Sequence, residues 1–209
     1  MQKNKIFKNF SLLLASCLLI FSMSICSAIS QGDPVGMLRS IANNMIAGLK
    51  SHQATLKTKP QIVYQLAYRY VVPYADLPEM SKRVLPPQTW NNATAAQRAQ
   101  FQREFTATVI RTYASALTSY RDQTIEFYPI RGGYQNDNTV EVNSKISGSD
   151  GEPISVSYRL IRHGGAWRLY DMSVEGVDML ESFRAQFADI LSQGDMAQLL
   201  QRLSSHNSR

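Results

Sequence analysis

The hydrophobic periodicity of this chain changes twice, and this order restricts the fold more than any other feature. Over about residues 34–121 apolar residues recur at helical spacing, and from Phe101 to Leu117 one occurs at every fourth position. From Gln123 onward apolar and polar residues alternate, as they do in half-buried strands. After Asp178 the helical spacing returns. The order predicts an α+β domain with helices packed on one face of a sheet.

Capping and breaking residues predict where the helices begin and end. Asp33-Pro34 is typical of a helix start, and Pro73 removes a backbone donor, which ends or kinks a helix. Thr94 and Gln97 have the spacing of a capping box. The expected helices cover about 34–56, 60–73, 77–85 and 95–121, and two more begin after Asp178 and Asp195.

Four alternating segments predict four strands. They are marked by Ile125/Phe127, Val140/Val142, Val156/Tyr158/Leu160 and Tyr170/Met172/Val174. His163-Gly164-Gly165 is typical of a tight hairpin between the last two strands. Short turns between consecutive strands predict a four-stranded antiparallel meander.

The first 28 residues have the pattern of a cleaved secretory signal peptide. Lysines at positions 3, 5 and 8 precede an uncharged run from Phe10 to Ile25, and small residues follow at Cys26-Ser27-Ala28. Two alternatives are a retained membrane anchor and a bacterial lipobox ending at Cys17. Cleavage after Ala28 would leave 29–209 as a single domain, which is long enough to bury its own core.

Charge and cysteine content exclude several functions. Of the 22 basic and 16 acidic residues, the leader holds three basic and no acidic ones, so 29–209 carries about +3. No dense Lys/Arg cluster with interleaved aromatic residues is present, which argues against nucleic acid as a partner. Both cysteines, Cys17 and Cys26, lie in the leader, so 29–209 has no disulfide and no thiolate ligand.

Few residues offer acid–base chemistry. His52, His163 and His206 are each expected to be solvated surface residues, with no carboxylate at a spacing that would hold a metal. Asp171 and Glu175 flank apolar residues of the last strand, where burial could raise a carboxyl pKa and create an acid. The alternative, which we favour, is that Asp171 orients a loop or a neighbouring arginine and Glu175 lies where the strand leaves the sheet.

Several segments are apolar on more faces than one core requires. They include Tyr70 to Tyr74, the broad stripe of the 95–121 helix, and Met172 to Leu180. The ordinary interpretation is a well-filled core. The alternative is a cavity between helices and sheet that is filled by an apolar ligand.

Three stretches of the chain resemble one known family. They are Val71-Val72-Pro73-Tyr74, the segment from Trp90 through Phe105, and Trp167-Arg168-Leu169-Tyr170-Asp171-Met172-Ser173-Val174-Glu175-Gly176-Val177. In order and spacing they are similar to the MlaC family of periplasmic phospholipid-binding proteins, also known as the toluene-tolerance auxiliary family. The similarity spans about residues 33–203.

This resemblance implies a strongly twisted antiparallel sheet, covered by helices, that encloses a deep apolar pocket. It implies a periplasmic carrier that moves glycerophospholipids between the outer and inner membranes to maintain outer-membrane lipid asymmetry. The carrier would have no enzymatic activity and no cofactor. The implied partners are an outer-membrane lipoprotein–porin complex and an inner-membrane ABC transporter complex with its MCE-domain subunit. The carrier itself would be a monomer.

The predicted lipid-binding residues come from two sources. The resemblance supplies Tyr113 and Val177. The apolar faces add eight more, namely Val72, Leu85, Val109, Leu117, Val142, Tyr158, Met172 and Leu180. Two other functions stay open at this stage: a small pocket enzyme that uses Asp171 or Glu175, and an envelope adaptor that binds proteins through the long helix without lipid.

Overall fold

The computed structural model describes residues 32–148 and 151–208. The predicted signal peptide at 1–28, the alternative lipobox at Cys17 and the cleavage point therefore lie outside the described residues. Within the described ranges, no helix is both long and apolar enough to cross a lipid bilayer.

The described chain forms an α+β fold, which confirms the fold class expected from the sequence. Its helices are α1 (Pro34–Ser51), α2 (Gln61–Tyr70), the 3₁₀ turn η1 (Val72–Tyr74), α3 (Leu77–Val84), α4 (Pro87–Asn92), α5 (Ala95–Thr118), α6 (Met179–Ser192) and α7 (Met196–Asn207). Its strands are β1 (Thr124–Phe127), β2 (Thr139–Ser147), β3 (Ile154–His163), β4 (Ala166–Val174) and β5 (Val177–Asp178).

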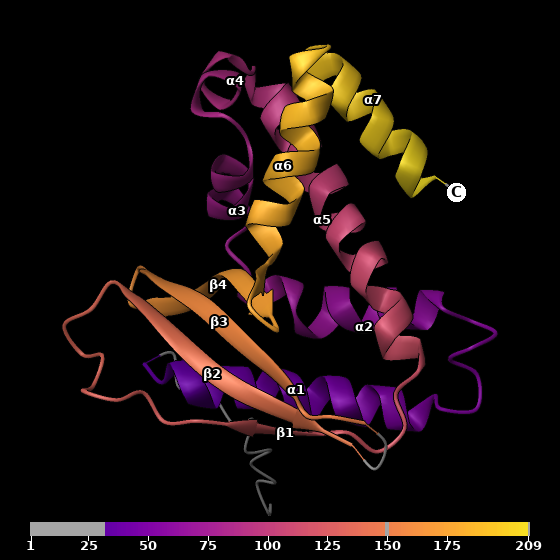
Figure 1. Ribbon diagram of the computed structural model, residues 1–209, viewed down its shortest axis with the longest axis vertical. Coiled ribbons are helices and arrows are strands. Elements are labelled where there is room, and N and C mark those ends of the chain that lie inside the picture. Colours follow the sequence, from indigo (N-terminus) through magenta and orange to yellow (C-terminus); the bar gives the residue numbers. More distant parts are fainter. Residues whose placement is uncertain (1–31, 149–150, 209) are drawn as a thin grey trace, which may run out of the picture.

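The strands form one antiparallel sheet in the order β1-β2-β3-β4-β5, so the predicted meander is confirmed. The strand β5 adds a fifth member to the four expected strands. It has only two residues, too few for an alternating pattern to be visible in the sequence. Figure 1 shows α1 lying along the sheet, while α3 to α7 form a separate group that extends away from it.

Side-chain caps form at Thr94 and Asp195 as predicted, while Asp33, before α1, makes none. Thr94 Oγ1 accepts from the backbone N–H of Gln97, whose side chain accepts from the N–H of Thr94, which completes the capping box of α5. Asp195 caps α7 by accepting from the N–H of Gln198 at 3.0 Å. Asp178 precedes α6 but its carboxylate makes no cap, because it pairs with an arginine of β3 instead.

Three helices end earlier than predicted, and one helix was not expected. The first ends at Ser51 and not near residue 56, because residues 52–58 continue as turns. The second ends at Tyr70, before the 3₁₀ turn η1 that contains Pro73, and α5 ends at Thr118 and not near 121.

The short helix α4 lies outside the expected helices. Pro87 is its first residue, a position where the missing N–H has no helical partner to lose.

The sheet register places most apolar strand residues on one face, which we call the inner face. Val142, Leu160 and Trp167 on this face pack against Met37 and Ile41 of α1. The β3–β4 hairpin turns at Gly164 and Gly165, both with positive φ (58° and 84°), which confirms the predicted tight turn. The fold therefore holds α1 against one part of the inner face, including Trp167 of β4, and leaves β5 and the end of β4 near Val174 to other elements.

We expect the capping box to be a measurable source of stability. The Thr94→Ala variant leaves the N–H of Gln97 without its acceptor, which costs about 1 kcal/mol of unfolding free energy. Urea unfolding followed by circular dichroism measures this loss. Thr118→Ala, at the other end of α5, removes a hydroxyl that only donates to Ser115 O and is the matched control. Equal losses in the two variants would contradict the capping role.

Candidate functional site

The buried core of the described chain is divided into three separate clusters. One lies among α3, α5, α6 and α7, a second between α1 and the sheet, and a third among α1, α2 and α5. A domain of this size usually has one contiguous core with small satellites. Half-buried side chains connect the three: Met172 of β4 packs on the first, and Val71 packs on the second and the third.

The inner face of the sheet is uncovered near its β5 edge. Val174 pairs with Val156 on one side and with Val177 on the other, so all three side chains lie on the inner face. Val177 is 64% exposed, although it is an aliphatic residue on an otherwise apolar face. Met172 and Val174 are only half-buried, whereas Trp167, farther along β4, is 1% exposed. Exposure therefore rises along the inner face toward Val177.

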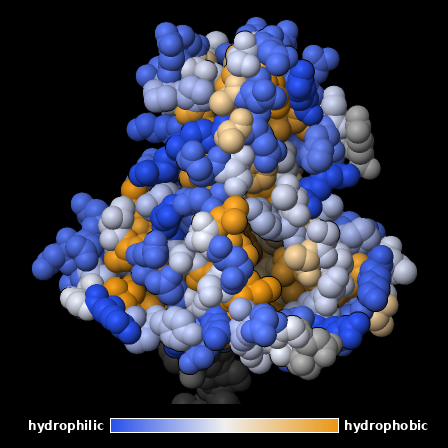
Figure 2. Space-filling view, in the orientation of Figure 1, coloured by the Kyte–Doolittle hydropathy of each residue, from blue (hydrophilic) through white to orange (hydrophobic). Residues whose placement is uncertain are grey.

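The uncovered apolar residues border a hollow. Figure 2 shows the surface depressed beside the β4–β5 turn, between the sheet and α2, with hydrophobic side chains at its walls. On α5, Val109, Tyr113 and Leu117 are also only partly buried, the first two against one core cluster and Leu117 against another. Met172 of β4 packs against the same cluster as Val109 and Tyr113, so this cluster reaches from α5 to the sheet, and each of the three residues is covered only in part.

The ten predicted lipid-binding residues occupy different positions relative to this hollow. Three are buried in protein contacts: Leu85 and Leu180 in the cluster of α3, α5, α6 and α7, and Val142 between α1 and the sheet. Seven are half-buried or exposed: Val72, Val109, Tyr113, Leu117, Tyr158, Met172 and Val177. The second group has free surface for a ligand, while the first supports the walls. Lipid contact by each of the ten stays a prediction.

Two residues at the hollow were not among those predicted. Val71 is half-buried and packs against both the α1–sheet cluster and the α1–α2–α5 cluster, so it lies where two walls meet. Val174 shares the inner face with Met172 and Val177. A signal for each was present in the sequence. The alternation of the last strand predicts that Val174 faces inward, and Val71 is the first residue of a stretch that resembles the family.

Asp171 is buried and its oxygens are occupied. Its Oδ1 accepts from the backbone N–H of Met172 at 2.8 Å and of Leu180 at 3.2 Å, and its Oδ2 accepts from Arg159 Nη1 at 2.8 Å. The same arginine nitrogen donates to Asp178 Oδ2 at 2.6 Å. This network joins β3, β4, the end of β5 and the start of α6, which agrees with a positioning role for Asp171.

Burial raises the pKa of Asp171 to about 6, and the hydrogen bond from its protonated form to Asp178 adds to the effect. The pKa of Asp178 is lowered, first by that hydrogen bond and then by Arg159. The pKa of Tyr113 is raised by burial and by the negative charge of Asp171. The Asp171–Asp178 pair therefore takes up one proton at a higher pH than an ordinary aspartate does.

Glu175 shapes the turn that carries Val177. Its φ is 50°, in the left-handed region that a residue other than glycine rarely adopts, and Gly176 follows with a φ of 77°. The Glu175 carboxylate accepts from the N–H of Ser155, and its own N–H donates to Ser155 O at 2.9 Å. Both contacts hold the β4–β5 turn to β3, which agrees with the predicted place of Glu175 where the strand leaves the sheet.

Of the three histidines, one does more than predicted. His163 is 55% exposed at the hairpin tip, but its Nδ1 lies 2.5 Å from Oδ2 of Asp76, a buried residue whose other oxygen caps α3. His163 is therefore the surface residue that was expected, with one carboxylate contact in addition. Sequence spacing could not show this contact, because residues 76 and 163 meet only through the tertiary fold. His52 and His206 lie at exposed helix ends, and no cluster of metal-ligating residues occurs in the described ranges.

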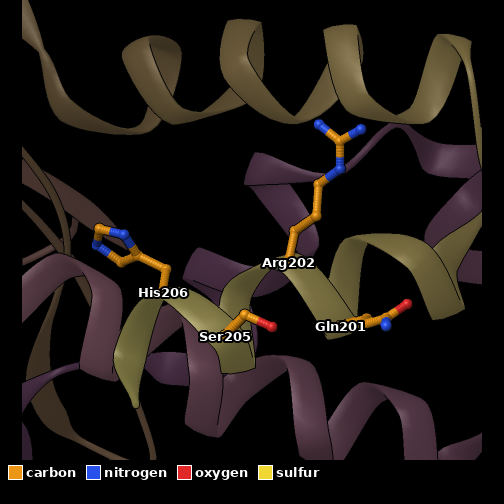
Figure 3. A pocket seen from close by; sticks show the side chains of 4 residues that line it. All are labelled: Gln201, Arg202, Ser205 and His206. Atoms are coloured by element: carbon orange, nitrogen blue, oxygen red, sulfur yellow. The ribbon is translucent and has the colours of Figure 1, made fainter. Parts of the chain in front are cut away.

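A second depression lies on α7 and has a different character. It measures about 380 Å³ and is lined by Gln201, Arg202, Ser205 and His206, all from that one helix (Figure 3). The four side chains are polar, and the surface they present mixes polar and apolar atoms. The depression therefore differs in make-up from the hollow beside the sheet.

We expect the Asp171→Asn variant to alter how stability depends on pH. The pKa of Asp171 is about 6 in the folded protein against an ordinary 3.8. The protonated Asp171 therefore stabilises the fold fully below pH 3.8. This contribution is lost as the pH rises through about 6. Asparagine cannot ionise and keeps an acceptor for the two N–H groups. Relative to wild type, the variant gains stability as the pH rises through this window.

Urea midpoints of the two proteins at closely spaced pH values measure this change. Asp137→Asn, in the exposed loop between β1 and β2, is the control, and its difference from wild type stays constant across the series. A constant difference for Asp171→Asn as well would show that the carboxyl is not perturbed.

Comparison with characterised proteins gives two relatives of similar length. The toluene tolerance protein ttg2D of Pseudomonas putida is 27% identical over 158 residues, covering 76% of this chain and 73% of that protein. The binding protein MlaC of the intermembrane phospholipid transport system of Haemophilus influenzae is 25% identical over 186 residues, covering 88% and 86%.

A solved structure has the same fold. The phospholipid-binding protein of Ralstonia solanacearum, determined in complex with a phospholipid, superimposes with a TM-score of 0.77 at 30% identity. The match covers 84% of this chain and 97% of that one. The family model described as MlaC protein matches residues 39–205, which is most of the sequence. The chain therefore belongs to the MlaC protein family.

Proposed function

We propose that this protein is a periplasmic phospholipid carrier that holds acyl chains in the hollow between the inner face of the sheet and the helices. The observation that carries the proposal is the exposed Val177 at the end of an apolar face whose neighbours Met172 and Val174 are half-buried. The two relatives and the solved structure support the choice of ligand, because two of the three are named for phospholipid binding or transport.

The energetics of acyl chains explain why such a carrier is needed. Each methylene removed from water contributes about 0.8 kcal/mol. Two chains with roughly 30 methylenes would therefore cost on the order of 25 kcal/mol to expose. Spontaneous transfer through water cannot compete with a route that keeps the chains covered.

The same energetics limit how tightly the carrier can bind. A bilayer also hides the methylenes, so the hollow must roughly match the bilayer or loading and unloading become strongly unfavourable. An apolar wall such as Val109, Leu117 and Met172 meets this requirement without directed bonds to the chains. Polar and basic groups at the opening would then distinguish head groups only weakly.

The polar residues favour a carrier over the pocket enzyme. Asp171 is engaged by two backbone N–H groups and Arg159, and Glu175 by Ser155, so neither carboxylate is available to a substrate in the hollow. We propose that the protein has no enzymatic activity and needs no cofactor.

The cellular setting follows from the family and from the predicted leader. We propose that the chain is exported, loses residues 1–28 and works as a monomer. It would exchange glycerophospholipid with an outer-membrane lipoprotein–porin complex and with an inner-membrane ABC transporter complex that has an MCE-domain subunit. This traffic would maintain the lipid asymmetry of the outer membrane.

Organic extraction of the purified protein tests the proposal directly. We expect phospholipid at about one molecule per chain in the extract, since one hollow with two apolar walls accommodates one diacyl lipid. Mass spectrometry and phosphate analysis measure the amount. An extract without phospholipid would favour the adaptor that binds proteins through α5, and a small molecule in its place would favour the enzyme.

A charge placed at the opening tests the position of the site. The Val177→Glu variant sets a carboxylate against the acyl chains. Desolvation of this carboxylate by the chains costs several kcal/mol. We therefore expect bound phospholipid to fall by about tenfold or more, since 1.4 kcal/mol is a factor of ten. The variant is expected to fold, because Val177 is already 64% exposed. Lipid per chain is measured by mass spectrometry of the purified protein.

Tyr128→Glu is the matched control for this variant. Tyr128 is 41% exposed and follows β1, at the opposite edge of the sheet from β5. The Tyr128→Glu variant introduces the same charge on an exposed residue away from the hollow. We expect it to leave bound lipid unchanged. Equal lipid content in Val177→Glu and wild type would count against the assigned site.

A further inference from the structure

Two hydroxyl groups interrupt the apolar inner face of the sheet. Ser144 of β2 is 2% exposed, and its cross-strand neighbours are Phe127 and Val156, both buried. Its Oγ donates to the phenol oxygen of Tyr158 on β3 at 3.3 Å. The Tyr158 ring packs on Phe127 with the ring centroids 5.7 Å apart. The pair is thus surrounded by apolar groups on the face that borders the hollow.

The hydrogen bond between them uses only part of what Tyr158 can offer. The two hydroxyls carry two hydrogens and the bond between them uses one, so one hydrogen of the pair remains without an acceptor among the described residues. Tyr158 is the less buried of the two residues, so its phenol is the group that can offer this hydrogen to a ligand. Buried hydroxyls normally have a partner for each such group, since an unmade hydrogen bond in an apolar setting costs free energy. Burial also raises the pKa of Tyr158, so the phenol keeps its proton.

The register fixes how far the phenol lies from the opening. Tyr158 pairs with Met172, and the next inward-facing pair along the strands is Val156 with Val174, which in turn pairs with the exposed Val177. Ser144, which the phenol reaches, pairs with Val156 and so lies in the same row as Val174 and Val177. Neighbouring strands are about 4.8 Å apart, so the hydroxyl pair on β2 and β3 lies about 10 Å or more across the sheet from Val177 on β5. The pair is therefore on the inner face, away from the exposed edge.

The acyl chains of a diacyl phospholipid offer a buried donor no acceptor except their ester carbonyls. We propose that Tyr158, oriented by Ser144, donates its phenol hydrogen to an ester carbonyl of the bound lipid and so selects ester-linked over ether-linked phospholipids. The inference rests on the proposed function and adds a specificity-determining residue to it. An ether oxygen is a weaker acceptor than an ester carbonyl, so the phenol would stay unsatisfied beside an ether lipid.

A competition between two matched lipids measures this selection. The full-length protein after signal removal is stripped of lipid and incubated with vesicles of equimolar dipalmitoyl- and di-O-hexadecyl-phosphatidylethanolamine, and bound lipids are quantified by mass spectrometry. These lipids share head group and chain length and differ in the carbonyls. We expect wild type to enrich the ester lipid about fivefold, which corresponds to one hydrogen bond of about 1 kcal/mol.

Three variants separate the proposed role from a structural one. Tyr158→Phe keeps the ring against Phe127 but removes the hydroxyl, and we expect its ester-to-ether ratio to fall to about one. Ser144→Ala leaves the phenol without its orienting donor, so an intermediate ratio is expected. Tyr120→Phe is the control. Tyr120 belongs to the α1–α2–α5 cluster, and its hydroxyl donates to Gln123 O. This variant is expected to keep the wild-type ratio.

The outcomes distinguish this inference from the proposed function. If wild type binds both lipids equally, or if Tyr158→Phe keeps the full ester preference, the inference is overturned while the carrier function stands. If wild type takes up neither lipid, the carrier function itself fails. A ratio that falls only in the Tyr158 and Ser144 variants, with total bound lipid maintained, supports the ester contact.

Discussion

The structure depends on leaving part of an apolar face uncovered while the protein remains folded. Hydrophobic burial is the main favourable contribution to folding, so an unfilled hollow gives up stabilisation that a filled core would provide. The three buried clusters compensate for this, because each wall of the hollow has its own packed interior. In the α3–α5–α6–α7 cluster, Phe105 contacts Phe101, Phe183 and Phe187 with ring centroids 5.4–5.7 Å apart. Such dense packing makes that wall independent of what occupies the hollow.

The opening is held by polar interactions in addition to packing, since Met179 and Leu180, which follow β5, are buried in the α3–α5–α6–α7 cluster. Arg159 joins Asp171 and Asp178, so the end of β5 and the start of α6 are fixed to the middle of β3. Glu175 holds the preceding turn to Ser155. These contacts allow Val177 to remain exposed without the turn collapsing onto the inner face, which a turn anchored only by hydrophobic contacts would do.

Most of the fold could be predicted from local chemistry. The capping box at Thr94, the glycine turn after His163 and the alternation of β2 to β4 each depend on neighbouring residues, and all are present. The unexpected α4 and β5 are too short for a periodic pattern. For the same reason the inward position of Val177 had to come from the family resemblance, because one residue cannot show alternation.

The site could be predicted only in part. Apolar faces identify residues that point inward, but they do not distinguish a residue that fills a core from one that borders a hollow. Leu85 and Leu180 have the same pattern as Val109 and Met172, yet the first two are buried by neighbouring helices. The contact of His163 with Asp76 and the pairing of Ser144 with Tyr158 join residues distant in sequence, so no spacing rule could find them.

The division of the core into three clusters has a mechanical consequence. Half-buried side chains connect the clusters: Met172 of β4 packs with Val109 and Tyr113 of α5, and Val71 packs on two clusters. Such partly covered side chains, the unbranched Met172 above all, can change rotamer while the buried clusters behind them stay unchanged. Under the proposed function, this adaptable lining lets one hollow accept acyl chains of different shape.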